Sequence, residues 1–276
     1  GAASQKRINE FLDEEIDTHT EGENIDELQK EIEFKNVWFK YPNTEKWVLQ
    51  DVSFKIKRDT QFGIIGTTGS GKSTIAKLLM GVYKPTLGKI LFDGKDMNGL
   101  NQGDLKQLFG YVSQDIFLFS DSIRNNILFG SNNDQDHQNL EKAIVSASLA
   151  GEIKSFPDGL ETILGERGIT LSGGQKQRTA IARALVKNPQ VLLIDDGLSA
   201  VDTKTEVQIK KSLAAWNQSQ TFINISHRIS SVKDSEHVVF MVEGKIVEEG
   251  THQQLKEHDG LYAELYQKQM QVGEEV

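Results

Sequence analysis

Gly66-Thr67-Thr68-Gly69-Ser70-Gly71-Lys72-Ser73-Thr74 is the stretch that decides the fold of this chain. It fits the pattern G-x-x-x-x-G-K-[ST], which is typical of loops that bind phosphate groups. Residues 62–65 before it are apolar enough for a buried strand, and residues 75–80 after it are spaced as in a helix. The motif requires this order of strand, glycine loop and helix. The alternative is a glycine loop in front of an ordinary helix, without a ligand.

The residue types of this loop suit a phosphate chain. Glycine tolerates the backbone angles and the close approach that wrapping a phosphate requires. The following helix directs its unpaired N–H groups and the positive end of its dipole at the anion. In this pattern Lys72 reaches the outer phosphates and the Ser73 hydroxyl binds Mg²⁺.

Length and composition indicate a globular chain. Its 276 residues, 37% hydrophobic and 26% charged, suit one large domain or two closely joined lobes. No run approaches the about 18 apolar residues of a membrane span, and no signal peptide is recognisable, so we expect the chain as given to be soluble. With no cysteine, disulfides and cysteine-based metal sites are excluded.

The charge of the chain is concentrated at its amino-terminal end. Residues 1–31 contain ten acidic and three basic residues, which is −7 of the net −9. The remaining −2 provides no broad basic surface, so we expect no nucleic-acid partner. Residues 7–16 have the spacing of one short helix, and residues 17–30 are typical of an acidic linker or of a solvated tail.

Alternating and continuous apolar runs predict strands along the rest of the chain. Residues 110–114, 191–194 and 221–226 are short apolar strands that end in polar residues, and residues 238–247 are typical of a hairpin. Residues 32–39, 48–56 and 88–92 predict further strands. Residues 116–185 are mostly helical in pattern, with loops at 131–136 and 157–159, and a strong helix candidate covers 177–186.

This alternation of strands and helices predicts an α/β fold with a mostly parallel sheet. In such sheets, ligands bind outside the carboxyl ends of the strands. The glycine loop, Gln114, Asp195 and His227 all follow strands directly. We therefore expect them to meet in one site.

Leu171-Ser172-Gly173-Gly174-Gln175 is the second informative stretch. Together with the phosphate loop and the strand that ends in Asp195, it resembles the signature of ATP-binding-cassette (ABC) proteins, in a match that runs from about residue 32 to residue 270. The resemblance implies a P-loop NTPase core, an amino-terminal antiparallel β subdomain and an inserted helical subdomain at about 116–185. It also implies carboxyl-terminal helices at about 251–272 and a linker over residues 1–31 that follows a transmembrane domain.

The resemblance assigns roles to individual residues. Tyr41 resembles the aromatic residue that stacks on adenine, although alone it is equally typical of a turn tyrosine on a sheet. Asp202 belongs to a segment that resembles the loop crossing the dimer interface, and His227 resembles the switch histidine. The nucleotide-binding residues implied are Tyr41, Gly66, Thr67, Thr68, Gly69, Ser70, Gly71, Lys72, Ser73, Thr74, Gln114, Ser172, Gly173, Gly174, Gln175 and Asp202. The metal ligands implied are Ser73, Gln114 and Asp195, with ATP and Mg²⁺ as cofactors, and the catalytic residues implied are Lys72, Asp196 and His227.

The phosphate loop already gives this chain one anion site. The second anion site, at Ser172–Gly174, is therefore expected to face the nucleotide of another chain. The resemblance implies a head-to-tail dimer with two ATP molecules between phosphate loop and signature.

Segments 7–13, 122–127, 165–168 and 244–252 resemble exporters, which implies a transmembrane partner with coupling helices and a place on the cytoplasmic face of a membrane (the inner membrane if the source is bacterial). Glu166 and Arg167 are also compatible with a solvated ion pair.

Asp196 departs from the pattern of active family members, which usually have glutamate there. Aspartate is one methylene shorter, and a base must lie within about 2.6–3.2 Å of the water that it activates. We therefore expect slow hydrolysis at this chain's own site and favour a heterodimer, in which the intact signature serves a competent partner site. A homodimer that tolerates aspartate is the alternative.

Two other functions stay open at the sequence level. A nucleotide-gated switch or assembly module with little turnover fits Asp196. An ABC ATPase of DNA repair or chromosome structure fits less well, because only about a hundred residues without sustained heptads separate Lys72 from Ser172.

Overall fold

The computed structural model describes residues 22–131, 134–165, 170–198, 200–216 and 219–271. The helix expected within residues 7–16 lies outside these ranges. So do most of the exporter-like segment 165–168 and the last residue of the predicted 251–272 helical region.

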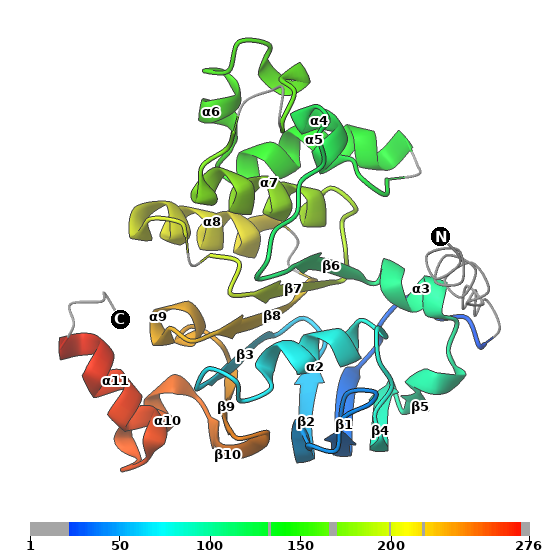
Figure 1. Cartoon of the computed structure of the whole chain (residues 1–276), viewed down its shortest axis with the longest axis vertical. Coiled ribbons are helices and arrows are strands. Elements are labelled where there is room, and N and C mark those ends of the chain that lie inside the picture. Colours follow the sequence, from blue (N-terminus) through cyan, green and yellow to red (C-terminus); the bar gives the residue numbers. More distant parts are fainter. Residues whose placement is uncertain (1–21, 132–133, 166–169, 199, 217–218, 272–276) are drawn as a thin grey trace, which may run out of the picture.

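A six-stranded sheet forms the centre of the molecule (Figure 1). All pairs within it are parallel except the one between the edge strand β10 and β9. Continuous apolar runs make its inner strands, which confirms the predicted parallel sheet. The strand order is β10 (Lys245–Gly250), β9 (His237–Val242), β3 (Gln61–Gly66), β8 (Thr221–Ser226), β7 (Val191–Asp195) and β6 (Phe109–Val112).

A second, antiparallel sheet lies below the first in Figure 1, and α2 (Lys72–Leu79) lies between the two. Buried side chains of α2, among them Ile75 and Leu78, belong to one core cluster with residues of both sheets. The helix that follows the glycine loop is therefore fixed from both sides. The strand order is β2 (Leu49–Lys57), β1 (Glu31–Phe39), β4 (Leu87–Phe92) and β5 (Lys95–Asp96).

The remaining helices form two groups. In Figure 1 a helical layer covers the β6 and β7 side of the sheet, and a carboxyl-terminal group lies beside β9. The first group is α4 (Ile123–Ile127), α5 (Asp134–Ser146), α6 (Ala150–Ile153), α7 (Gly173–Leu185) and α8 (Thr203–Trp216). The second is α9 (Ile229–Val232), α10 (His252–Glu257) and α11 (Leu261–Gln271), while α3 (Gln102–Gln107) precedes β6. The loop predicted at 131–136 is too long, because α5 begins at Asp134.

The described part of the acidic segment, residues 22–30, is packed on the body and is not a solvated tail. Ile25 and Leu28 are buried. The carboxylate of Asp93 accepts hydrogen bonds from the backbone N–H groups of Gln29, Lys30 and Glu31, at 2.7, 2.7 and 3.0 Å. The charge pattern did not predict this packing, because the segment contains few apolar residues and many acidic ones.

Replacing Asp93 by Ala is expected to release this segment, because three backbone donors lose a charged acceptor. We expect the free energy of unfolding to fall by about 2 kcal/mol and the amides of residues 29–31 to exchange faster in hydrogen-exchange mass spectrometry. Asp93→Asn is the matched control, since asparagine keeps one acceptor oxygen and tolerates the positive φ of 52° at this position. Unchanged exchange in Asp93→Ala would contradict the anchoring role.

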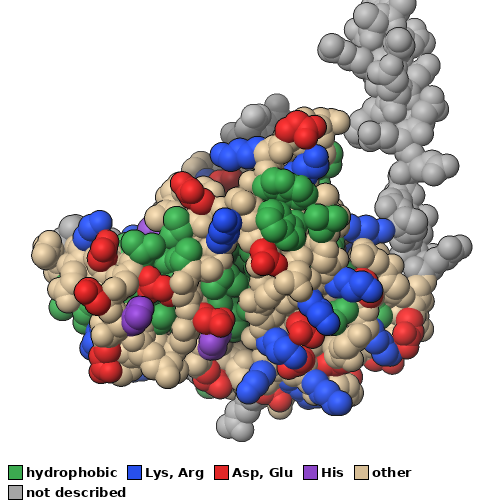
Figure 2. Space-filling view, turned by 90° about the horizontal axis from the view of Figure 1, so that it is seen from below, with side chains coloured by type: hydrophobic (Ala, Val, Ile, Leu, Met, Phe, Trp, Pro, Cys, Tyr) green, Lys and Arg blue, Asp and Glu red, His purple; other side chains and the backbone are tan. Residues whose placement is uncertain are grey.

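The face of the molecule in Figure 2 carries interspersed acidic and basic side chains. Within the described part of the chain, no helix is long and apolar enough to cross a bilayer.

Candidate functional site

The glycine loop connects β3 to α2, as its sequence predicts, and close contacts or backbone angles disfavour larger residues at two of its glycines. A Cβ atom at Gly66 would lie 2.1 Å from the carbonyl oxygen of Met241. At Gly71, where φ is 96°, it would lie 2.7 Å from the side chain of Leu49. The turn between β9 and β10 also supports the loop, because Gly244 N–H donates to the Ser70 carbonyl at 3.1 Å.

One cavity of about 420 Å³ brings together seven of the sixteen residues predicted to bind nucleotide, with the predicted catalytic residues Asp196 and His227. These residues come from the glycine loop, from the exit of β6 and from the ends of β7 and β8, so four separate segments converge. Its lining residues are Val48, Thr68, Gly69, Gly71, Lys72, Ser73, Thr74, Gln114, Asp196 and His227. Val48 is the one member that the sequence did not indicate.

Lys72 lies inside the curve of the loop. Its Nζ donates to the carbonyl oxygens of Gly66 and Thr67, each at 2.9 Å. Burial lowers the pKa of the Lys72 ammonium, while the nearby carboxylates of Asp196 and Asp195 oppose this shift. A buried cation with two carbonyl partners is suited to a strongly anionic ligand.

Asp195 closes β7 and is buried next to the loop. Burial raises the pKa of its carboxyl group to about 6, although a hydrogen bond from Ser73 acts in the opposite direction. Within the described residues, its Oδ1 is buried and has no hydrogen-bond partner. A carboxylate oxygen and the Ser73 hydroxyl are hard oxygen donors of the kind that Mg²⁺ prefers.

Asp196 and His227 are in direct contact. The Oδ1 atom of Asp196 lies 2.9 Å from Nδ1 of His227 and accepts from the His227 backbone N–H at 3.3 Å. Asp196 has a left-handed backbone, with φ of 48°, a conformation in which aspartate and asparagine are enriched. Its carboxylate is therefore held towards the histidine by two contacts to one oxygen.

Tyr41 is joined to the loop through its hydroxyl, which lies 3.0 Å from Oγ1 of Thr74. Its ring meets Phe39 and Tyr83 edge-on, and Nζ of Lys77 lies 5.4 Å from its centre. The ring is half-buried and packed on the core, as either a turn tyrosine or a base-stacking residue would be.

The signature segment lies apart from this cavity, since none of its residues is among the lining residues. Ser172 caps α7 in a capping box with Gln175, so the helix begins at Gly173, earlier than the candidate at 177–186. Gly173 lies against Ala200, so the signature and the described part of the segment ending at Asp202 are neighbours. One chain thus contains two separate parts of the predicted site.

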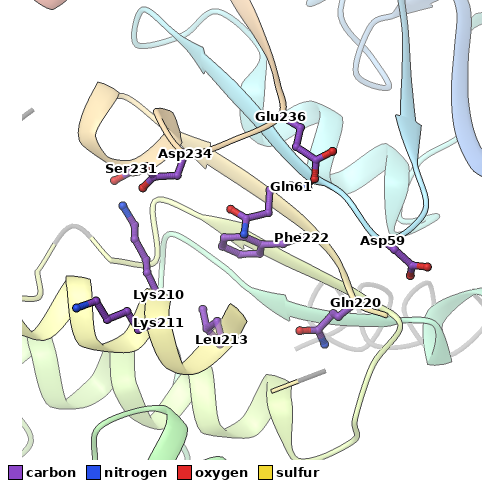
Figure 3. Close-up of a pocket in the computed structure, with 10 residues that line it drawn as sticks. All are labelled: Asp59, Gln61, Lys210, Lys211, Leu213, Gln220, Phe222, Ser231, Asp234 and Glu236. Carbon is purple, nitrogen blue, oxygen red and sulfur yellow. Dashed lines mark hydrogen bonds between the residues drawn. The ribbon is translucent and has the colours of Figure 1, made fainter. Parts of the chain in front are cut away.

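Another cavity, of about 320 Å³, opens at the amino-terminal ends of β3 and β8, away from the glycine loop (Figure 3). Its basic and acidic side chains are mixed, and Lys210 already contacts the carboxylate of Glu206 and donates to the Ser230 carbonyl. This cavity has no side chain of the predicted site.

Replacing Asp195 by Asn is expected to stabilise the metal-free chain at neutral pH. The unfolded carboxyl ionises near pH 3.8 and the folded one near 6, so burial of the charge destabilises the folded chain fully above pH 6 and not at all below 3.8. We expect a gain of about 3 kcal/mol at pH 7.5 that falls to about half at pH 5. Urea unfolding at the two pH values measures it, and a pH-independent difference would contradict this explanation.

Comparison with known proteins gives consistent matches. The ABC transporter family model matches residues 49–199. The chain is 41% identical over 271 residues to a probable multidrug resistance ABC transporter ATP-binding/permease protein of Bacillus subtilis, covering 98% of this chain and 46% of that protein. It is 39% identical to an ATM1-type heavy metal exporter of Novosphingobium aromaticivorans, covering 95% and 44%.

A solved structure of a bacterial Atm1-family ABC exporter with ATP bound superposes with a TM-score of 0.89 at 37% identity, over 98% of this chain and 47% of that chain. The chain spans slightly less than half the length of these relatives. The family match covers more than half of the chain and agrees with the predicted fold, so this chain belongs to the ABC transporter family.

Proposed function

We propose that this chain is the ATP-binding and ATP-hydrolysing domain of an ABC exporter. Its own hydrolytic site is slow, because Asp196 replaces a longer carboxylate. The observation that carries the proposal is the division of the site: four segments form a phosphate cavity, and the signature helix begins elsewhere on the same chain. The relatives support export, since one is named a heavy metal exporter, another a multidrug resistance ATP-binding/permease protein, and the solved structure is of an Atm1-family ABC exporter.

The loop residues bind the phosphates of ATP. Backbone N–H groups of the glycine loop and the first turn of α2 face the anion, and Lys72 neutralises the outer phosphates. Tyr41 offers an aromatic face to the adenine from the edge of the same cavity.

The residues at the loop fit Mg²⁺. Ser73, Gln114 and Asp195 supply a hydroxyl, an amide and a carboxylate oxygen, and the free Oδ1 of Asp195 needs a cation to offset its burial. When bound, Mg²⁺ would offset charge on the β- and γ-phosphates of ATP.

Asp196 and His227 act on the attacking water and the terminal phosphate. Asp196 is the base that orients and polarises the water, and His227 contacts the transferred phosphoryl group. Because one oxygen of Asp196 is held by His227, and the side chain is short, the carboxylate reaches the water poorly.

The site is completed by a second chain. Ser172, Gly173, Gly174, Gln175 and Asp202 meet the nucleotide on the phosphate loop of the partner domain, and the partner does the same here. We favour a heterodimer, because the intact signature of this chain then completes a competent site on the partner chain.

Coupling helices of a transmembrane domain, at the cytoplasmic face of a membrane, connect dimerisation of the ATP-binding domains to export. The relatives are named for multidrug resistance and for heavy metal export, so we assign the choice of substrate to the transmembrane part.

Mg-ATP is expected to shift the chain from monomer to dimer, and Ser172→Arg is expected to abolish the shift. An arginine at Ser172 would block the approach of the partner's phosphate loop without entering this chain's own cavity. Sedimentation velocity with Mg-ATP and Mg-ADP measures it, with Gln107→Arg, at an exposed position on α3, as the control. ATP-dependent dimers that form equally well with Ser172→Arg would contradict the composite site.

A nucleotide-gated switch with little turnover is the second candidate function, favoured by the contact between Asp196 and His227. A switch would show the same dimerisation but no phosphate release, even with a competent partner chain. A motor would release phosphate at the partner's site.

A further inference from the structure

Gln269, on the last helix, α11, reaches across to the segment that carries His227. Its side chain is buried, with 9% of the residue exposed. Its Nε2 donates to the carbonyl oxygen of His227 at 2.9 Å, and its Oε1 accepts from the N–H of Ile229 at 2.9 Å. One side-chain amide thus bonds to the backbone of both His227 and Ile229, although Gln269 lies 42 residues after His227 in the chain.

These two bonds satisfy backbone groups that the segment leaves open. Ile229 begins α9, and the first N–H groups of a helix need partners from outside it. The N-cap residue Arg228 makes no side-chain cap bond within the described residues. Gln269, from a distant helix, therefore caps the amino-terminal end of α9 and also fixes the position of the His227 carbonyl.

Asp196 holds the same histidine from the other side. It contacts Nδ1 and the backbone N–H of His227, while Gln269 holds the backbone carbonyl. The His227 side chain itself is 50% exposed and lines the cavity at the glycine loop. The position of His227 is therefore set by three polar contacts, two from Asp196 and one from Gln269.

A cavity of about 430 Å³ separates α11 from the glycine loop. Leu265 and Gln269 of α11 line it from one side, and Gly66, Thr67 and His227 from the other. Beside this hollow, the side-chain amide of Gln269 is a polar connection between α11 and the segment that carries His227. The helix is fixed at its own start by Glu248, which accepts from the N–H groups of Leu261 and Tyr262.

We propose that Gln269 is a positioning residue for ATP hydrolysis, which acts through His227 and makes the site sensitive to the position of α11. This inference rests on the proposed role of His227 at the terminal phosphate. Loss of Gln269 would let the His227 backbone turn away and would leave nucleotide binding intact, because no loop residue that contacts phosphate depends on it.

The test is single-turnover hydrolysis of radiolabelled ATP, with the 276-residue chain in excess, in a cycle of Gln269→Met and His227→Ala. Methionine keeps the volume and removes both hydrogen bonds. Gln269→Met is expected to slow hydrolysis about tenfold, with the Kd for ATP changed less than about twofold, and to have no further effect in His227→Ala. Gln269→Glu, which keeps the acceptor for Ile229 and loses the donor to His227, is expected to slow hydrolysis as well. Gln267→Met, at an exposed position of the same helix, is the control.

The outcomes separate the two proposals. If His227→Ala slows hydrolysis and neither Gln269 variant does, the positioning role is wrong and the proposed function stands. If Gln269→Met slows hydrolysis equally with and without His227, the residue acts through general stability and the inference is also wrong. If His227→Ala itself leaves the rate unchanged, the proposed role of His227 fails first, and the positioning role fails with it.

Discussion

Replacement of Asp196 by Glu is expected to speed ATP hydrolysis by this chain about a hundredfold. The added methylene moves the carboxylate towards the attacking water, and a misplacement of around 1 Å can change a rate by that factor. It also frees the carboxylate from the contact with His227 that holds the shorter side chain. Single-turnover and steady-state phosphate release measure the effect, and the chain's own signature completes the site in the homodimer that forms at high concentration.

The matched control is Asp59→Glu. Asp59 is exposed and shares the left-handed backbone of Asp196, with φ of 60° against 48°, so both variants place glutamate in the same strained conformation. Asp59→Glu reports the effect of a glutamate with a left-handed backbone alone. The difference between the two variants therefore reports the effect of the longer carboxylate at the site. If wild type hydrolyses ATP as fast as Asp196→Glu, aspartate is tolerated and the slow-site proposal is wrong.

Replacement of Lys72 by Met is expected to weaken ATP binding about a hundredfold or more. Two charge-assisted hydrogen bonds to phosphate oxygens are together worth about 3 kcal/mol, which is about two orders of magnitude in Kd. Burial already lowers the pKa of Lys72, so the ammonium gains strongly from an anionic ligand. Equilibrium dialysis with Mg-ATP measures the loss.

Lys84→Met is the control for this variant, because Lys84 is an exposed lysine of the same part of the chain. Thermal unfolding should show that the loop survives the loss of the bonds from Lys72 to Gly66 and Thr67. A Kd within threefold of wild type, in a folded Lys72→Met variant, would contradict phosphate binding at this loop.

The parallel sheet and the phosphate loop could be predicted from the sequence because the causes are local. Continuous apolar runs mark buried strands, and the loop, its strand and its helix lie next to one another in the chain. The ends of β6, β7 and β8 could be placed together because parallel strands share a carboxyl edge, and the cavity that contains Gln114, Asp196 and His227 follows this geometry.

What could not be predicted depends on contacts between distant residues. Asp93 anchors residues 29–31 from 62 to 64 positions away, and Gln269 reaches His227 across 42. In a sequence, such an aspartate or glutamine cannot be distinguished from an exposed polar residue. Its partners are backbone groups, which every residue type provides. Val48 enters the cavity through another contact between distant residues, because Val48 and Leu49 lie against Gly71 of the loop.

The measurement that tests the central claim most directly is the identity of the nucleotide that the chain holds. Wild type and Asp196→Glu are loaded with Mg-ATP at equal concentration, freed of excess nucleotide by rapid filtration, and analysed by chromatography over time. The proposal predicts intact ATP on wild type long after the glutamate variant holds only ADP. Conversion to ADP at the same rate in both chains would show that Asp196 does not limit hydrolysis, and the absence of bound nucleotide on wild type would contradict the phosphate site itself.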